Sequence, residues 1–256
     1  MKMDCIIQAR MNSTRLPGKV LLSIDDNFTV LHHMINQLKF SKLIDSIIIA
    51  TTNLPDDDVI EEEAKKLNLR YFRGDSEDVL DRYYQCAKKF NCKNIIRLTS
   101  DCPLIDPEII DQMIINYKLE NFDFYTNVIN RTFPVGTDVE IFSFDVLKNM
   151  WTNANLASER EHVTLFIKNK KTDFKIGNLE NAEDLKHIRI TLDREEDLIL
   201  IRKITSKLSK KPILVNEIRD LFLNEPSLHK INQHVLQNEG LLKSLKKDQN
   251  IETKGD

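Results

Sequence analysis

The fold of this 256-residue chain is decided near its start by Cys5–Lys19, which reads Cys-Ile-Ile-Gln-Ala-Arg-Met-Asn-Ser-Thr-Arg-Leu-Pro-Gly-Lys. The apolar run at its beginning, Cys5–Ala9, predicts a buried β-strand. The residues after it supply arginine, lysine and hydroxyl side chains, and the loop ends on Pro-Gly, which is a turn signal. Fixed cations and the backbone N–H groups of a tight turn are groups that bind phosphate. A strand that leads into such a loop predicts a phosphate site.

Short apolar runs alternate with helical patterns over the first 120 residues. The expected strands are Cys5–Ala9, Ser46–Thr51, Arg70–Arg73 and Asn94–Thr99. The expected helices are Val30–Phe40, Asp56–Leu67, Asp78–Phe90 and Pro107–Leu119. This alternation predicts an α/β fold of the Rossmann-like type, with a mainly parallel, twisted sheet and helices on both faces.

The second half of the chain has a mixed pattern. Its expected strands are Asp123–Asn127, Thr137–Phe142, Asp173–Gly177 and His187–Thr191. Its expected helices are Ser143–Met150, Glu159–Lys168, Glu195–Leu208 and Val215–Leu223. We therefore expect one domain over residues 1–225 and a helical, polar tail over residues 226–256 that frays at its end.

Composition narrows the classes of function. The net charge of −3 gives no overall basic field, which disfavours nucleic acid as the main partner. No stretch approaches eighteen apolar residues, so the sequence predicts neither a signal peptide nor a membrane span. The four cysteines form no Cys-x-x-Cys pair, which favours a reducing cytoplasm over a disulfide framework.

Polar side chains follow each of the first four expected strands. In an open α/β sheet, ligands bind beyond the carboxyl ends of the strands. The residues at these ends are Arg10, Ser13, Thr14, Arg15 and Lys19 after the first strand, Thr51, Thr52 and Asn53 after the second, Gly74, Asp75 and Ser76 after the third, and Ser100 and Asp101 after the fourth. A basic cluster and a carboxylate should therefore share one edge of the sheet. The alternative is that Arg15 and Lys19 are solvated surface charges.

Two aspartates are candidate Mg²⁺ ligands. Asp101 directly follows an apolar strand, and a carboxylate beside a phosphate loop suits Mg²⁺. A helix cap is the alternative for Asp101, but Asp106 is better placed to cap the next helix. Asp193 follows the alternating run Ile188–Leu192, and for this residue capping and metal binding remain equally open.

These residues resemble the signature of cytidylyltransferases that activate sugar acids, of the 3-deoxy-manno-octulosonate type, and more closely the SpsF-like branch, named for spore-coat polysaccharide synthesis. The segments that carry the resemblance are Gln8–Lys19, Gly74–Tyr83, Arg97–Asp106, Arg160–Thr164 and Leu192–Leu198. The octulosonate enzymes usually have proline in place of Gln8, and Gly-Asp-Glu-Pro in place of Ser100–Pro103. These departures leave the acceptor open.

The resemblance implies a Mg²⁺-dependent enzyme in which an acceptor oxygen attacks the α-phosphate of CTP and releases pyrophosphate. It assigns Arg15, Lys19, Asp101 and Asp193 to catalysis, with Asp101 and Asp193 as the metal ligands. The nucleotide-binding residues would be Ala9, Arg10, Ser13, Thr14, Arg15, Lys19, Thr51, Thr52, Gly74, Asp78, Arg82 and Ser100. The partners would be CTP and a small sugar-type acceptor, used for surface polysaccharide or glycoconjugate synthesis, and a homodimer is possible.

Several of these assignments have simpler alternatives. Asp78 could only cap its helix, and Arg82 could pair with Asp78 at the i, i+4 spacing. Residues expected near the acceptor are Gly136, Asp138, Glu140 and His162. His162 could instead be a packing residue.

Two rival functions stay open. The same loop could serve a transferase that uses GTP or UTP. The chain could also bind a nucleotide without turnover, although the presence of both Asp101 and Asp193 argues against this.

Overall fold

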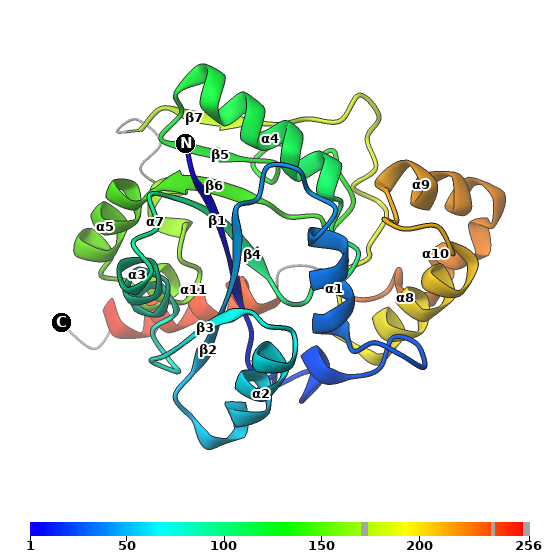
Figure 1. Cartoon of the computed structure of the whole chain (residues 1–256), viewed down its shortest axis with the longest axis horizontal. Helices are drawn as coiled ribbons and strands as arrows, with labels where there is room; N and C mark the ends of the chain where they lie inside the picture. The colour runs from blue at the N-terminus through cyan, green and yellow to red at the C-terminus, as the bar shows by residue number, and fades with distance from the viewer. Residues whose placement is uncertain (170–173, 237–238, 253–256) are drawn as a thin grey trace.

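The computed structural model describes residues 1–169, 174–236 and 239–252 and, within them, places seven strands in one sheet in the order β3-β2-β1-β4-β6-β5-β7 (Figure 1). Four strands run parallel, namely β1 (Met3–Gln8), β2 (Ser46–Thr52), β3 (Arg70–Gly74) and β4 (Asn94–Thr99). The other side of the sheet contains β6 (Glu140–Ser143), β5 (Phe124–Thr126) and β7 (Ile176–Asn178). Strand β6 is antiparallel to both of its neighbours, β4 and β5, whereas β5 and β7 are parallel. This mainly parallel sheet confirms the predicted fold class.

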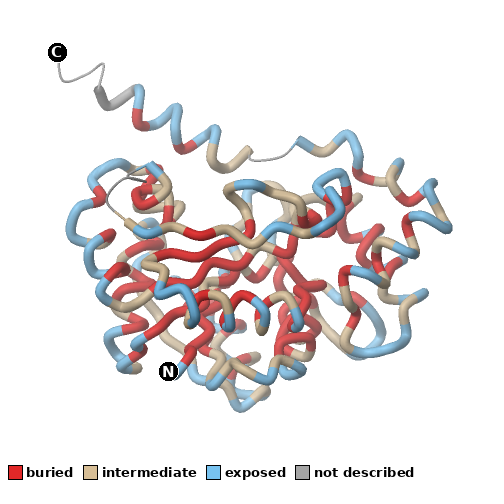
Figure 2. The backbone as a smooth tube through the Cα atoms, turned by 90° about the horizontal axis from the view of Figure 1, so that it is seen from above, coloured by how far each residue is buried: buried red, intermediate tan, exposed pale blue. Residues whose placement is uncertain are grey.

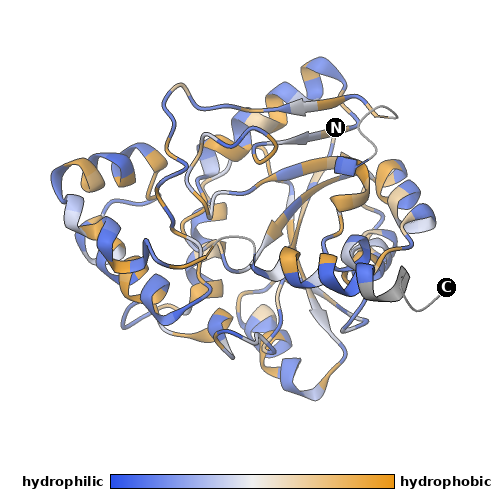
Figure 3. Ribbon diagram, turned by 180° about the vertical axis from the view of Figure 1, so that it is seen from behind, coloured by the Kyte–Doolittle hydropathy of each residue, from blue (hydrophilic) through white to orange (hydrophobic). Residues whose placement is uncertain are grey.

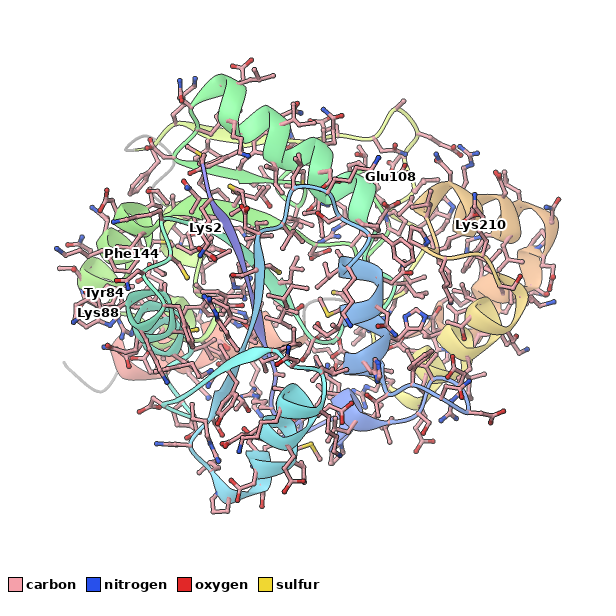
Figure 4. The ribbon with its side chains drawn as sticks, in the orientation of Figure 1. Lys2, Tyr84, Lys88, Glu108, Phe144 and Lys210 are labelled. Atoms are coloured by element: carbon pink, nitrogen blue, oxygen red, sulfur yellow. The ribbon has the colours of Figure 1, made fainter. Side chains whose placement is uncertain are left out.

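Alternating side chains of the central strands supply the cores on both faces of the sheet, and the strands are accordingly apolar in Figure 3. Cys5 and Ile7 of β1 belong to one core, and Ile6 belongs to the other. The first core is covered by α1 (Val30–Leu38), α2 (Asp58–Lys66) and α4 (Pro107–Glu120). The second is covered by α3 (Val79–Lys89) and α5 (Phe144–Asn153). Tyr84 of α3 stacks on Phe144 of α5, with ring centroids 5.6 Å apart (Figure 4).

A third apolar cluster lies beside the sheet and is built by the later helices. These elements are α8 (Glu195–Lys207), α9 (Val215–Asn224), η4 (Pro226–Leu228) and α10 (His229–Asn232). Ile190 and Leu192 pack into this cluster, and so does Leu228. The packing therefore continues past residue 225, and the division of the chain at that point stays a prediction.

The expected strand His187–Thr191 is wrong. In the structure this segment joins no sheet, and its only ladder contact among the described residues is a single bridge between Val135 and Arg189. Its alternating pattern has another cause, because Ile188 and Ile190 fill the third apolar cluster. Every second side chain of this segment is thus buried although the segment has no neighbouring strand.

The expected helix Glu159–Lys168 is interrupted. It forms as α6 (Ala157–Glu161) and α7 (Leu165–Asn169). Val163 between them has φ of +47°, outside the helical region, and the Thr164 hydroxyl donates to Glu140 at 2.8 Å. The interruption turns His162 and Thr164 toward the candidate site. Asp173, the first residue of the expected strand that became β7, lies outside the described residues.

The C-terminal helix α11 (Glu239–Glu252) packs against α6 and runs alongside the main body (Figure 2). Residues 237–238 and 253–256 of the expected tail lie outside the described residues. Among the described residues, no helix combines the length and apolar character needed to cross a membrane.

Candidate active site

The loop after β1 folds back on itself and turns Lys19 inward. Gly18 adopts φ of +69°, which favours glycine, and its N–H donates to the carbonyl of Met11 at 2.8 Å. The Met11 N–H in turn donates to Asp57 Oδ1 at 2.7 Å, which ties the loop to η2 (Pro55–Asp57). The chain then enters η1 (Lys19–Leu21), so the Lys19 side chain points beneath the loop, where it is mostly buried.

Lys19 bridges the two predicted metal ligands. Its Nζ lies 3.0 Å from Asp101 Oδ2 and 2.9 Å from Asp193 Oδ1, although these residues are far apart in the sequence. Arg15 Nη2 contacts the same oxygen of Asp193 at 2.5 Å. The backbone also joins the two aspartates, because the Leu192 N–H donates to the Asp101 carbonyl at 2.8 Å. Four predicted catalytic residues therefore meet at one point.

This cluster is charged at neutral pH. Burial alone would raise the pKa of Asp101 and of Asp193. It is outweighed by Lys19 together with the Thr99 hydroxyl at Asp101, and by Lys19 together with Arg15 at Asp193, so that both pKa values lie below the ordinary range. Burial would likewise lower the pKa of Lys19, and the two carboxylates raise it instead. The site is thus a preformed pair of carboxylates around a cation.

A buried network holds Asp193 in place and shows whether it caps α8. Arg189 donates to both oxygens of Asp197 at 2.9 Å and to Asp193 Oδ2 at 3.3 Å. Asp197 Oδ2 accepts from the N–H groups of Asp193 and Arg194 at the start of α8, and Asn232 of α10 donates to Oδ1. The N-cap of α8 is therefore Arg194, whose N–H donates to Asp197 within the helix, so Asp193 does not cap α8 and its carboxylate faces Lys19.

Asp101 is likewise free of a capping role. The side chain of Asp106 accepts from the N–H of Glu108 at 2.8 Å and caps α4. Asp101 instead accepts from the Thr99 hydroxyl at 2.5 Å and from Lys19.

Three adjoining cavities extend along the carboxyl edge of the sheet, and Arg15, Thr99 and Asp101 line all of them. The smallest, about 150 Å³, lies under the loop. It is lined by most of the predicted nucleotide residues, namely Ala9, Arg10, Ser13, Thr14, Arg15, Lys19, Arg82 and Ser100. The other two open on either side of Asp101. The one of about 450 Å³ is lined by Gly136 and Asp138, and we call it the acceptor-side cavity. The one of about 770 Å³ is lined by Thr52 and Asp78, and we call it the nucleotide-side cavity.

The remaining predicted nucleotide residues are more scattered. Thr52 and Asp78 line the nucleotide-side cavity, whereas Thr51 and Gly74 line none of the three. Thr51 is fully buried in β2, and Gly74 instead gives Arg82 room, because a Cβ there would approach Arg82 Cγ to 3.0 Å.

Asp78 and Arg82 do not pair with each other. Asp78 caps α3 by accepting from the Asp81 N–H at 2.8 Å, and it also forms an ion pair with Arg160. Arg82 is buried and donates from Nη1 to the carbonyl of Asp75 at 2.6 Å. The alternative of an i, i+4 pair between them is therefore wrong, and the Arg82 guanidinium lines the smallest cavity.

The acceptor-side cavity contains three of the four residues expected there. Gly136 has φ of +110°, and a Cβ would lie 2.5 Å from the Thr191 nitrogen, so only glycine permits this approach to the segment that leads to Asp193. Asp138 forms a two-bond ion pair with Arg131 at 2.6 and 2.7 Å. His162 lines the cavity as well.

The fourth expected acceptor residue, Glu140, does not line any of the cavities. It lies beneath them in β6, where it pairs with Arg97 and with Lys168, both at 2.6 Å. Arg97 and Lys168 themselves line the acceptor-side cavity, so Glu140 fixes the cations that face it.

His162 contacts another element of the chain. Its Nε2 lies 3.1 Å from the Ser244 hydroxyl of α11. Burial lowers the pKa of His162 and outweighs the opposing effect of Glu161, so the ring is neutral at pH 7.

The pH dependence of stability tests the Glu140 cluster. Burial would raise the pKa of Glu140, but Lys168 and Arg97 lower it to about 2, against an ordinary value of 4.5. A lowered pKa stabilises the fold above the ordinary value, and this stabilisation is lost as the pH falls toward the folded value. Urea unfolding should therefore show that Glu140→Gln is less stable than the wild type at pH 6, with a difference that shrinks between pH 4.5 and pH 2.

The exposed Glu62 of α2 provides the control for this measurement. Glu62→Gln should track the wild type across the same pH range. A stability difference for Glu140→Gln that stays constant down to pH 2 would show that the carboxylate is not held by these cations.

The sequence interpretation missed several residues around the site. They are Arg97, Thr99, Arg131, Lys168, Arg189, Asp197 and the cavity-facing residues of α11. One available signal was Arg97, a charge inside an otherwise apolar strand. Its Nη2 donates to Gln8 Oε1 at 3.0 Å, a bond that the proline of the octulosonate enzymes could not form.

Comparison with known proteins agrees with this architecture. The sequence model of a family described as cytidylyltransferase matches residues 5–243. The chain is 36% identical to the spore coat polysaccharide biosynthesis protein SpsF of Bacillus subtilis, over 86% of this chain and 94% of that protein. It is 37% identical to an uncharacterized protein of Methanocaldococcus jannaschii, over 93% of this chain and 97% of that protein.

Solved structures show the same fold. A cytidylyltransferase from Leptospira borgpetersenii is 37% identical and superposes with a TM-score of 0.85, over 89% of this chain and 96% of that one. A CMP:2-keto-3-deoxy-manno-octonic acid synthetase complexed with CTP superposes with a TM-score of 0.63 at 16% identity, over 81% of this chain and 99% of that one.

Proposed function

Because the chain belongs to the cytidylyltransferase family, we propose that it transfers CMP from CTP to a sugar-type acceptor and releases pyrophosphate. The acceptor would be a sugar, a sugar acid or a phosphorylated compound, and the product would serve surface polysaccharide or glycoconjugate synthesis. The name of the SpsF relative and the CTP complex of the octonic acid synthetase support this choice.

The observation that carries the proposal is the meeting of Arg15, Lys19, Asp101 and Asp193 between two cavities. CTP would occupy the side formed by the loop after β1, and the acceptor would occupy the side that contains Gly136. The reacting α-phosphate would then lie beside the carboxylate pair. This arrangement supports an in-line displacement, in which positioning supplies much of the rate.

In this reaction, the acceptor oxygen forms a bond to the α-phosphorus, and the bond to the bridging oxygen breaks. Pyrophosphate leaves with the electron pair of that bond. Arg15 and Lys19 would neutralise the negative charge that develops on the leaving group. Thr99 and the Leu192 carbonyl hold Asp101 and Lys19 in position, so little rearrangement is needed during the reaction.

The residues present fit a Mg²⁺ ion. Asp101 and Asp193 direct oxygens at one cation, Lys19 Nζ, so their geometry already suits a shared positive charge. One or two carboxylates, completed by substrate phosphates, are a set of ligands that Mg²⁺ takes in sites of phosphoryl transfer. When bound, Mg²⁺ would neutralise phosphate charge and favour ionisation of the acceptor hydroxyl.

Pyrophosphate release tests the proposed function. The purified protein would be incubated with Mg²⁺, each of the four common NTPs in turn and a panel of sugars, sugar acids and sugar phosphates. We expect release with CTP and one acceptor class. Release with GTP or UTP instead would identify a different transferase. Tight CTP binding without release from any acceptor would favour a nucleotide-binding protein without turnover.

Arg15→Ala tests the loop separately. Losing a hydrogen-bonded cation should weaken CTP binding by roughly tenfold to a hundredfold, as measured by isothermal titration calorimetry. Arg219→Ala, on α9 and away from the three cavities, should leave the affinity unchanged. Equal CTP affinity in Arg15→Ala and the wild type would remove the loop from the triphosphate site.

A cytoplasmic location remains part of the proposal. All four cysteines are free and buried, which suits a reducing compartment. The homodimer stays a prediction.

A further inference from the structure

The C-terminal helix α11 forms one wall of the nucleotide-side cavity. Arg10 and Arg15 of the loop after β1 line this cavity, and Gly240, Lys243 and Lys247 of α11 line it too. The three α11 positions are three and four residues apart, so they share one face of the helix. A helix that begins more than 200 residues after the loop thus contributes to the same cavity.

Polar contacts hold this face of α11 against the body. Ser244 donates to Glu161 Oε2 at 2.6 Å, and Asp248 Oδ1 accepts from the Ser158 N–H at 3.1 Å. Ser244 and Asp248 are buried, and each directly follows one of the two cavity-facing lysines. The anchoring residues therefore fix the direction in which Lys243 and Lys247 leave the helix.

The beginning of α11 is tied to the triphosphate loop. Glu239 pairs with Arg194 at 2.9 Å and approaches Arg15 Nε at 3.8 Å. A Cβ built on Gly240 would lie 3.9 Å from Arg15 Nη1, so the backbone of α11 passes directly over this guanidinium. Phosphates bound at Arg15 would consequently lie close to the first turns of α11.

The two lysines, like Arg10, differ in charge balance from the arginines of the cavity that are paired with carboxylates. Arg15 and Arg160 are each paired with an aspartate, whereas Lys243 and Lys247 have no ion-pair partner among the described residues. Leu242, by contrast, points into solvent. The helix thus presents the unpaired charges of Lys243 and Lys247 to the cavity and the apolar side chain of Leu242 to solvent. Unpaired positive charge at a cavity favours an anionic ligand.

We propose that Lys243 and Lys247 bind the phosphates of the nucleotide from the side opposite the Arg10–Lys19 loop. This inference rests on the proposed function, because it takes the loop as the triphosphate site. The flexible stem of lysine lets its ammonium follow a phosphate oxygen without a fixed fork geometry. The C-terminal helix would then be part of the nucleotide site.

Calorimetry with CTP, inorganic pyrophosphate and cytidine tests this inference on the full chain with Mg²⁺. The variant Lys243→Gln/Lys247→Gln keeps good helix formers at both positions. We expect its dissociation constants for CTP and pyrophosphate to rise roughly tenfold and its affinity for cytidine to stay unchanged. The difference should shrink at high salt, since both lysines are exposed.

Lys246→Gln is the matched control, because Lys246 lies on the same helix but does not line the cavity. It should bind CTP like the wild type, and Lys243→Arg/Lys247→Arg should retain the affinity. Equal CTP affinity in the double glutamine variant and the wild type would overturn the inference while leaving the proposed function intact. An equal loss in Lys246→Gln would overturn it too, by showing a diffuse charge effect. A wild-type protein that binds neither CTP nor pyrophosphate would overturn both proposals.

Discussion

Asp101→Asn and Asp193→Asn should each lower kcat by roughly a thousandfold or more, with the fold intact. Each substitution keeps the shape of the side chain but removes one of the two charges that converge on Lys19. The remaining carboxylate still pairs with Lys19, so the buried ammonium keeps a partner and the loss of stability should be small. Pyrophosphate release under saturating CTP and acceptor measures kcat, and thermal unfolding checks the fold.

Asp220→Asn is the matched control for these variants. Asp220 is an exposed carboxylate of α9 that pairs only with its neighbour Arg219 among the described residues. Its substitution should leave kcat unchanged. Near wild-type turnover in either site variant would show that the carboxylate pair is not the metal site. A rise in the Mg²⁺ concentration needed for half-maximal rate would support the assignment independently.

The sheet edge was predictable because parallel strands impose it. Ser46–Thr51 is β-branched and apolar along its length, which indicates a strand buried on both faces, and the structure places β2 between β1 and β3. Once these strands are parallel, the residues after each must lie on one edge. That rule alone predicts that Lys19 and Asp101 lie close together, although 82 positions separate them in the sequence.

The supports of the site could not be predicted in the same way. Arg189, Asp197 and Asn232 meet through side-chain hydrogen bonds between an extended segment and two helices, and no local pattern in the sequence encodes such contacts. The same extended segment was mistaken for a strand because its apolar residues alternate for another reason. Glu140 was expected near the acceptor, but strand alternation places it beneath the cavity with Arg97.

The C-terminal helix shows a further limit of pattern reading. Helix α11 has few large apolar residues, so hydrophobic periodicity predicts only a loose tail. Its attachment depends instead on individual polar contacts, such as those of Ser244 and Asp248 with α6. Contacts of this kind depend on the position of the partner helix, which the sequence does not display.

Asp197→Ala should destabilise the protein by roughly 3–5 kcal/mol, because it leaves the buried guanidinium of Arg189 without its main partner. It also removes the acceptor for the N–H groups of Asp193 and Arg194, which directly precede α8. Asp197→Asn keeps one oxygen that can accept from these groups, so its loss should be smaller. Urea unfolding at pH 7 compares the two variants, with Glu196→Ala, a half-exposed neighbour on α8 that contacts His234, as the control.

The same variants also separate stability from catalysis. Without the negative charge of Asp197, Arg189 can turn toward Asp193, whose Oδ2 it already contacts at 3.3 Å, and compete there with Lys19 and Mg²⁺. We therefore expect folded Asp197→Asn to need more Mg²⁺ for half-maximal rate, while Glu196→Ala does not. A loss below about 1 kcal/mol in Asp197→Ala would contradict the buried ion pair, since removing one partner of such a pair costs several times more. An unchanged Mg²⁺ requirement in Asp197→Asn would show that Asp193 keeps its position without this network.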